Sequence, residues 1–302
     1  MISKSRLRIH GSPKEHGDYV VYWMISARRP FYNHSLEYAI NLAKEKKLPL
    51  VIVEALAIGH KWANDRSHTF VIQGMLANKK VFDDSEVTYI PYVETKPKEA
   101  KGLLKKWMEF ADTLVIDEYP TYYPKRVIET AIRFASCPVH VVDSNGFIAL
   151  NHTDKNFTTA YSLRRHIHKT ITTHMAEFPN PNPLKSANGL PKLDKSIIES
   201  VFQSSDTPIT PFEFLWRVGE PDNVGENALS VLAIDHSVHS VKHVKGGFRE
   251  ASIKWNSFLT SRLLDYGEKR NQPEQNGSSG LSPYLHFGHI SSHQILDEIF
   301  TR

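Results

Sequence analysis

The sequence predicts an α/β protein whose N-terminal half is a doubly wound parallel sheet. Five short, mostly apolar runs of strand length occur in the first half, and helical patterns separate them. Strands that are apolar on both faces and alternate with helices are typical of a parallel sheet covered on both sides. The first run is not followed by Gly-x-Gly-x-x-Gly, so a dinucleotide-binding Rossmann fold lacks its usual support.

The expected strands are short and lie between candidate helices. They cover residues 19–25, 50–53, 87–90, 113–116 and 139–142. The helices between them repeat apolar residues three or four positions apart, which is the spacing of one helix face. They cover residues 35–46, 69–82, 98–110 and 123–134. The turn signal Asn145-Gly146 then ends the five-stranded domain.

The second half indicates helices joined by a polar connector. Residues 157–178 form a candidate amphipathic helix, and residues 179–225 are rich in Pro, Ser and Asn. A further helix is expected from about Phe248 to Gly267. The apolar stripe of the candidate helix at 157–178 comprises Ala160, Leu163, Ile167, Ile171, Met175 and Phe178. We therefore expect three parts: an α/β domain at 1–146, a connector at 147–226, and the start of a helical domain at 227–302.

Composition places the chain among globular proteins, with 40% hydrophobic and 23% charged residues. The net charge of +4 permits a polyanionic partner without requiring one. The single cysteine, Cys137, excludes a disulfide within the chain and is expected to be a small buried residue. No apolar run approaches the roughly 20 residues of a membrane span, and no secretory core follows the N-terminus. We expect a cytoplasmic protein with no membrane partner.

The most informative motif is the loop Ser278-Ser279-Gly280-Leu281-Ser282, followed by Pro283. Serine hydroxyls are short donors for phosphate oxygens, and Gly280 lets the main chain approach an anion. Ser282 and Pro283 fit the N-cap and first position of a helix, whose N–H groups would face the same anion. The alternative is an ordinary polar loop before a helix. Ser291 with Gln294 fits a capping box for the last helix.

The loop and its flanks resemble the FAD-phosphate loop of the DNA photolyase/cryptochrome family. Tyr266, Arg270 and Pro273 precede the serines at the family's spacing, and the Pro-Tyr-Leu-His-Phe-Gly that follows Ser282 looks most like class II photolyases. The resemblance runs from about Asp18 to the end of the chain. Further matches occur in the expected order at Arg28-Arg29-Pro30-Phe31-Tyr32-Asn33, Trp62-Ala-Asn-Asp-Arg66 and Asp117-Glu118-Tyr119-Pro120.

The resemblance implies an antenna-type α/β domain and the first helices of an all-α FAD-binding domain. It implies FAD, an antenna chromophore of unknown type, and UV-damaged DNA carrying pyrimidine dimers as the partner of a monomer. The implied activity is that of a deoxyribodipyrimidine photolyase, a carbon–carbon lyase in which light drives electron transfer from reduced FAD to a flipped-out lesion. Arg270 is a supporting candidate, which could pair with a phosphate or with Glu268 or Glu274. The implied cofactor-binding residues are Tyr266, Ser278, Ser279, Gly280, Leu281 and Ser282.

The family continues into a long helical part that this sequence does not include. Residues 227–302 are few for a domain that encloses FAD, so we expect this chain alone to bind FAD weakly or not at all and not to repair DNA. No residue is assigned to catalysis, to lesion contact or to flavin reduction. A cryptochrome-like flavin photoreceptor and a stand-alone α/β ligand-binding module are the alternatives.

Other polar patterns favour structural interpretations. His236, His239 and His243 could share a helix face and bind zinc, but an extended segment fits equally and no metal is predicted. Asp117-Glu118 suits a helix N-terminus, where acidic residues are favourable. Arg28-Arg29 could meet an antenna chromophore, although a solvated loop is expected.

The basic residues carry only a weak signal for DNA, because they are scattered and interleaved with acids. They are Arg164, Arg165, His166, His168, Lys169, Lys242, Lys245, Arg249, Lys254 and Arg262.

Overall fold

The structure is a computed structural model that describes residues 2–203, 215, 218, 220, 221, 224 and 226–301. Its centre is a sheet with the strand order β1-β6-β5-β2-β3-β4. The five strands from β2 to β6 run parallel, which confirms the predicted fold class. Their bounds are β2 (Tyr19–Met24), β3 (Leu50–Leu56), β4 (Thr88–Val93), β5 (Ala111–Asp117) and β6 (Val139–Val142).

The sheet has six strands rather than the predicted five. The additional strand, β1 (Leu7–His10), runs antiparallel to β6 at the edge of the sheet. It has only four residues, and Ile9 is 56% exposed. It therefore lacks the buried apolar run that identifies the other strands, and antiparallel edge strands on parallel sheets are common.

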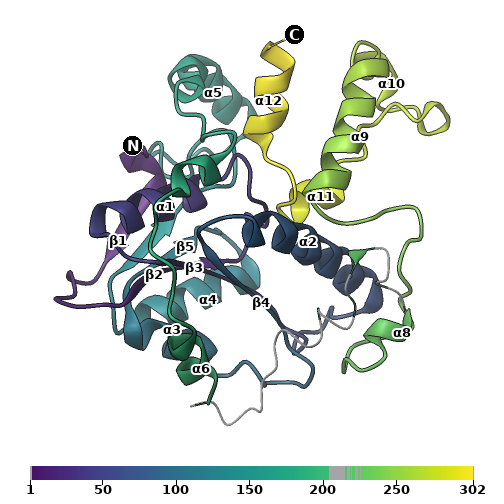
Figure 1. The fold of residues 1–302 in the computed structure, drawn as a ribbon. Helices are drawn as coiled ribbons and strands as arrows, with labels where there is room; N and C mark the ends of the chain where they lie inside the picture. The colour runs from purple at the N-terminus through teal and green to yellow at the C-terminus, as the bar shows by residue number, and fades with distance from the viewer. Residues whose placement is uncertain are drawn as a thin grey trace.

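Helices cover both faces of the sheet, as predicted (Figure 1). On one face, Tyr19 and Val21 pack with Trp107 and Ile128. On the other face, Val20 and Tyr22 pack with residues such as Ile40. The helices are α1 (His34–Lys46), α2 (Asp65–Asp83), α3 (Leu103–Phe110) and α4 (Tyr122–Arg133). Cys137 is free and buried, as expected.

The rest of the described chain is helical. After the α/β domain come α5 (Ala160–Met175), α6 (Lys195–Gln203), α8 (Glu226–Leu229), α9 (Phe248–Ser261), α10 (Tyr266–Lys269), α11 (Ser282–His286) and α12 (Ser292–Phe300). Short 3-10 turns occupy Lys4–Arg6, Pro183–Ala187 and Pro273–Gln275. Much of the predicted connector beyond residue 203 lies outside the described residues. Within the described ranges, no helix combines the length and apolar character needed to cross a membrane.

Two helix predictions need correction. The helix expected from Phe248 to Gly267 is broken, because the N–H groups of Arg262 and Leu263 both donate to the carbonyl of Phe258 and end α9. The predicted apolar stripe of α5 is also not a buried face: His174 is the buried residue of that helix, and Leu163 and Met175 are exposed.

Helices α9 and α11 are docked on α2, and α12 packs against the same hydrophobic cluster. Phe70 of α2 belongs to their hydrophobic core, together with Trp255, Phe258 and Tyr284. Glycines permit the close approach: a Cβ at Gly246 would lie 1.8 Å from the carbonyl oxygen of Phe70. The helical segment is therefore held in place by the α/β domain (Figure 1).

Candidate functional site

The serine- and glycine-rich loop joins α10 to α11 and is clamped through its backbone (Figure 1). The guanidinium of Arg262 donates to the carbonyl oxygens of Asn276 and Ser278, at 3.2 and 3.3 Å. Gly277 lies so close to α10 that a Cβ there would be 2.4 Å from the carbonyl oxygen of Lys269. Because the main chain makes these contacts, the serine side chains are left to other partners.

The hydroxyls of the loop are available to a ligand. Ser278 and Ser282 are exposed, and neither side chain has a hydrogen bond to the described part of the chain. The Ser279 hydroxyl accepts weakly from the N–H of Leu281, at 3.4 Å. These groups can therefore donate to an anion without first losing a strong internal partner.

Gly280 brings a lysine to the loop. Its φ of +67° lies in the left-handed region, and a Cβ there would lie 2.3 Å from Cε of Lys254 and 3.2 Å from its Nζ. The end of the Lys254 side chain, from α9, therefore crosses the loop where a larger residue would stand. Sequence reasoning counted Lys254 only among the scattered basic residues, because nothing in the local sequence shows that α9 packs against residue 280.

Tyr266 and Arg270 lie beside the loop. The Tyr266 ring meets Phe258 edge-on, with 5.5 Å between centroids, and Tyr266 is 37% exposed. The Arg270 guanidinium lies 5.8 Å from the centroid of the Tyr266 ring. Within the described residues it makes no ion pair with Glu268 or Glu274. Tyr266 and Arg270 thus contact each other at α10, whose Lys269 carbonyl approaches Gly277 of the loop.

The predicted start of the following helix is wrong by one residue. The N-cap of α11 is Leu281, Ser282 is its first residue, and no side chain caps it. The helix has only five residues, so the predicted anion site at its N-terminus is not supported. Ser291 does cap α12 as predicted, accepting from the N–H of His293 at 3.1 Å. Gln294 donates to Glu298 instead of completing a capping box.

Asp117 is a structural carboxylate. It accepts from the hydroxyl of Tyr22 and from the N–H groups of Ile25, Ser26 and Ala27, at 2.7–2.9 Å. It does not lie at a helix N-terminus, contrary to the prediction, because α4 begins only at Tyr122. The adjacent Glu118 pairs with Arg8. Both carboxylates are therefore already engaged with protein donors.

The two arginines after β2 are not in a solvated loop as expected. Arg28 forms an ion pair with Glu54 at 2.9 Å. Arg29 is buried and donates to the carbonyl oxygens of Gly288, Tyr32 and Ser144. Burial lowers the pKa of Arg29 to about 10. These side chains hold the fold together, so no contact to an antenna chromophore is assigned to them.

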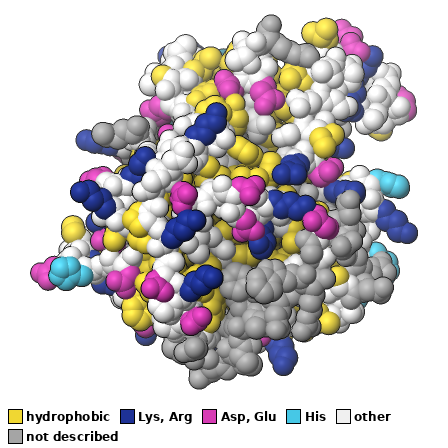
Figure 2. Space-filling view, in the orientation of Figure 1, with side chains coloured by type: hydrophobic (Ala, Val, Ile, Leu, Met, Phe, Trp, Pro, Cys, Tyr) yellow, Lys and Arg dark blue, Asp and Glu magenta, His cyan; other side chains and the backbone are white. Residues whose placement is uncertain are grey.

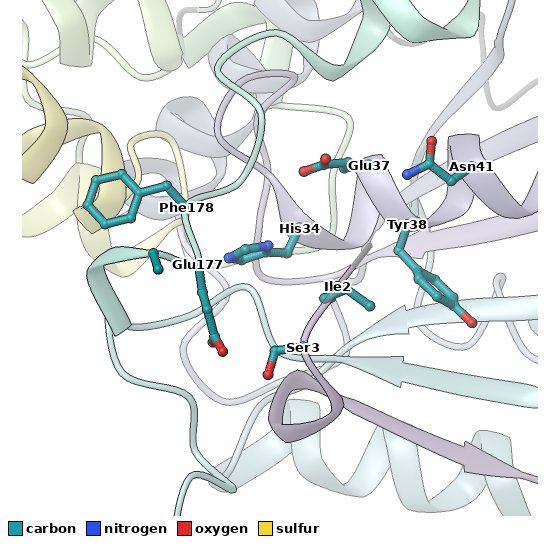
Figure 3. Close-up of a pocket in the computed structure, with 9 residues that line it drawn as sticks. Ile2, Ser3, His34, Glu37, Tyr38, Asn41, Glu177 and Phe178 are labelled. Atoms are coloured by element: carbon teal, nitrogen blue, oxygen red, sulfur yellow. The ribbon is translucent and has the colours of Figure 1, made fainter. Parts of the chain in front are cut away.

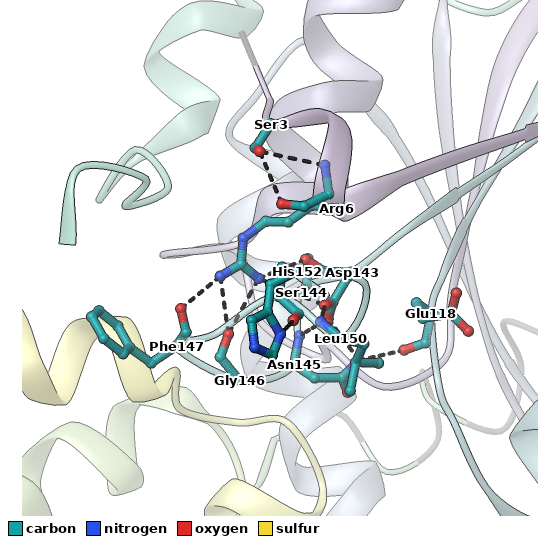
Figure 4. Close-up of polar contacts among 12 residues, drawn as sticks. Ser3, Arg6, Glu118, Asp143, Ser144, Asn145, Gly146, Phe147, Leu150 and His152 are labelled. Atoms are coloured by element: carbon teal, nitrogen blue, oxygen red, sulfur yellow. Dashed lines mark hydrogen bonds and ion pairs between the residues drawn. The ribbon is translucent and has the colours of Figure 1, made fainter. Parts of the chain in front are cut away.

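Arg6 makes a similar network at the same turn after β6 that Arg29 contacts through Ser144. It donates to the carbonyl oxygens of Asp143, Gly146 and Phe147, at 3.2, 3.2 and 2.8 Å (Figure 4). This contact fixes the turn after β6, near the predicted domain boundary. A cavity of about 360 Å³ opens nearby, lined by residues that include His34, Glu37 and Glu177 (Figure 3). None of the loop residues lines it.

His236 of the histidine pattern is engaged with a carboxylate. Nδ1 of His236 lies 2.8 Å from a carboxylate oxygen of Asp65, and this hydrogen bond raises the pKa of His236. No group of three or more potential metal ligands occurs within the described ranges. On the face shown in Figure 2, Lys and Arg side chains are interspersed with Asp and Glu, so no continuous basic stripe marks a DNA path there.

The fold and the loop together define the class: a doubly wound α/β domain bearing a docked helical segment with a serine- and glycine-rich loop. No protein-family profile matches the chain. It is 27% identical over 295 residues to the deoxyribodipyrimidine photo-lyase of Methanothermobacter thermautotrophicus, covering 96% of this chain and 58% of that protein. It is likewise 27% identical over 280 residues to the deoxyribodipyrimidine photo-lyase of Arabidopsis thaliana, covering 90% and 51%.

A solved structure shows the same fold. The bacterial class III photolyase from Agrobacterium tumefaciens superposes with a TM-score of 0.58 and 16% identity, covering 95% of this chain and 54% of that one. The resemblance to DNA photolyases predicted from the sequence is therefore confirmed. The chain spans about half the length of the curated relatives it matches. The finer likeness to class II stays a prediction.

Proposed function

We propose that the chain forms the antenna-type domain and the first flavin-contacting helices of a deoxyribodipyrimidine photolyase. The reaction is light-driven, FAD-dependent repair of cyclobutane pyrimidine dimers in DNA. The observation that carries the proposal is the loop at 278–282, whose backbone is clamped while its hydroxyls stay free. The photolyase relatives support it, because they match this chain over nearly all of its length.

The residues present fit part of an FAD molecule. The exposed Ser278 and Ser282 offer donors to phosphate oxygens, and Gly280 allows the main chain to approach them. Tyr266 offers a ring face and a hydroxyl beside the same loop. Leu281 is buried in the helical core and fixes the end of the loop. When bound, reduced FAD would supply the light-excited electron that splits the dimer.

This chain's own residues bind and orient the cofactor in the proposal, and none is assigned to catalysis. Arg262 positions the loop by binding its carbonyl oxygens rather than the ligand. Phe258 supports both Arg262 and Tyr266 from below the surface. The same proposal includes the division of the chain at 1–146, 147–226 and 227–302. It also includes an antenna chromophore, a monomeric state, a cytoplasmic location and damaged DNA as the partner.

An absorption spectrum of the purified chain, before and after FAD is added, is the first test. We expect little or no bound flavin, because residues 227–302 are few for a domain that encloses FAD. A chain that purifies with stoichiometric flavin would show that its helices already complete a pocket. Joining residues 1–302 to the second half of the Methanothermobacter relative tests the function itself. The chimera should bind FAD and repair dimer-containing DNA only in light.

Repair distinguishes the proposal from the alternatives. A chimera that binds FAD but repairs no dimers in light would favour a photoreceptor. A chimera that binds no FAD would instead favour a stand-alone α/β ligand-binding module with a helical tail.

A further inference from the structure

We propose that Lys254 is the cation that pairs with the pyrophosphate of the bound dinucleotide, with its ammonium reaching the loop across Gly280. The inference deepens the proposed function and rests on it in one respect, that the loop at 278–282 receives phosphate. From the sequence, Arg270 is only a supporting candidate for this role.

The other cations near the loop already have contacts. Arg262 donates to Asn276 and Ser278 and lies over the ring of Phe258. Lys269 is ion-paired with Asp265. Arg270 is exposed and lies over Tyr266. Each of these positive charges is directed to a protein group.

Lys254 differs from them in position and in pairing. Its Nζ lies beside Gly280, and it has no hydrogen bond or ion pair to the described part of the chain. Glu250, one helical turn earlier on α9, makes no ion pair with it among these residues. Lys254 is half-buried, so its charge is less screened than that of an exposed lysine. An ammonium beside Gly280, in a loop whose Ser278 and Ser282 hydroxyls have no partner among the described residues, is suited to a phosphate group.

The position of the Lys254 side chain depends on the absence of a side chain at Gly280. Any side chain at 280 would displace the lysine, because its Cβ would stand 2.3 Å from Cε. The glycine thus serves two purposes, since it accepts a φ of +67° and leaves room for the cation.

The test uses the 302-residue chain and sodium pyrophosphate as the probe, at low salt. Binding is measured by calorimetry and by the amide chemical shifts of Ser278–Ser282. We expect Lys254→Met, which keeps the length of the side chain but removes its charge, to weaken binding about tenfold. Lys254→Arg should restore it to within a few fold. Lys269→Met removes a charge from the same region and should change binding little, because that lysine is already paired.

The outcomes separate the inference from the function on which it rests. Unchanged binding by Lys254→Met, with binding lost in Ser278→Ala, would overturn the role of Lys254 and leave the phosphate loop standing. An equal loss in Lys269→Met would also overturn it, by showing a general charge effect. If pyrophosphate moves none of the loop amides in the unmodified chain, both the inference and the loop's phosphate role fail.

Discussion

The guanidinium of Arg29 donates a hydrogen bond to the backbone carbonyl of Gly288, with 3.0 Å between Nη1 and the oxygen. The contact joins the loop after β2 to the turn between α11 and α12. A second contact reinforces it, because Gly288 has a φ of +74° and approaches the carbonyl of Ser26. The candidate loop is therefore oriented by residues that are far from it in sequence.

Gly288→Ala should separate the helical segment from the α/β domain. A Cβ at this position would lie 1.6 Å from the Ser26 carbonyl oxygen, and the left-handed backbone adds its own penalty. We expect a loss of about 2–4 kcal/mol in unfolding free energy, measured by urea denaturation. Gly267→Ala is the matched control, because nothing lies within 4 Å of its position. Equal stabilities for the two variants would contradict the close contact.

Arg29→Met should cost about 3 kcal/mol or more, because it leaves carbonyl oxygens at Gly288, Tyr32 and Ser144 without their donor. Urea unfolding followed by circular dichroism measures the change. Arg164→Met, on the exposed face of α5, removes the same charge and should change stability by less than about 0.5 kcal/mol. A similar small effect at Arg29 would show that its hydrogen bonds contribute little.

The sequence predicts an element well when its buried residues are neighbours in the sequence. The strand predicted at 139–142 matches β6 residue for residue, because a short continuous apolar run indicates a buried strand. Arg29 was expected in solvent because arginines are mostly exposed, yet its partners Gly288 and Ser144 lie 259 and 115 positions away. Lys254 was missed for the same reason. The local spacing of apolar residues does not indicate which residues make tertiary contacts.

Asp117→Asn should destabilise the loop after β2. One carboxylate oxygen accepts three backbone N–H groups, and an amide cannot offer acceptors at both oxygen positions. We expect a loss of about 2 kcal/mol. Glu118→Gln, at the next residue, breaks a partly exposed pair with Arg8 and should cost less than about 1 kcal/mol. Thermal unfolding of the two variants side by side tests the difference, and reversal of their order would refute it.

Stability should fall as the solution becomes acidic, through His289 and His293. Burial lowers the pKa of each to about 3, with Arg29 adding to the shift of both. His289 accepts from the N–H of Gly247 at 2.9 Å, and Nε2 of His293 lies 3.3 Å from Nη2 of Arg6. Both rings must stay neutral in the folded protein to keep these contacts.

The direction of this pH dependence follows from proton binding in the folded and unfolded states. Between about pH 6.5 and pH 3 the unfolded chain binds protons at these histidines and the folded chain does not, so unfolding is favoured as pH falls. Each histidine should remove about 1.4 kcal/mol per pH unit in that window, and the contribution is fully present only above pH 6.5. Urea unfolding at about pH 7, 6 and 5 measures the slope. His293→Gln should flatten the slope by the contribution of one histidine. If His293→Gln keeps the full slope, His293 does not titrate with unfolding, and its contact with Arg6 does not require a neutral ring.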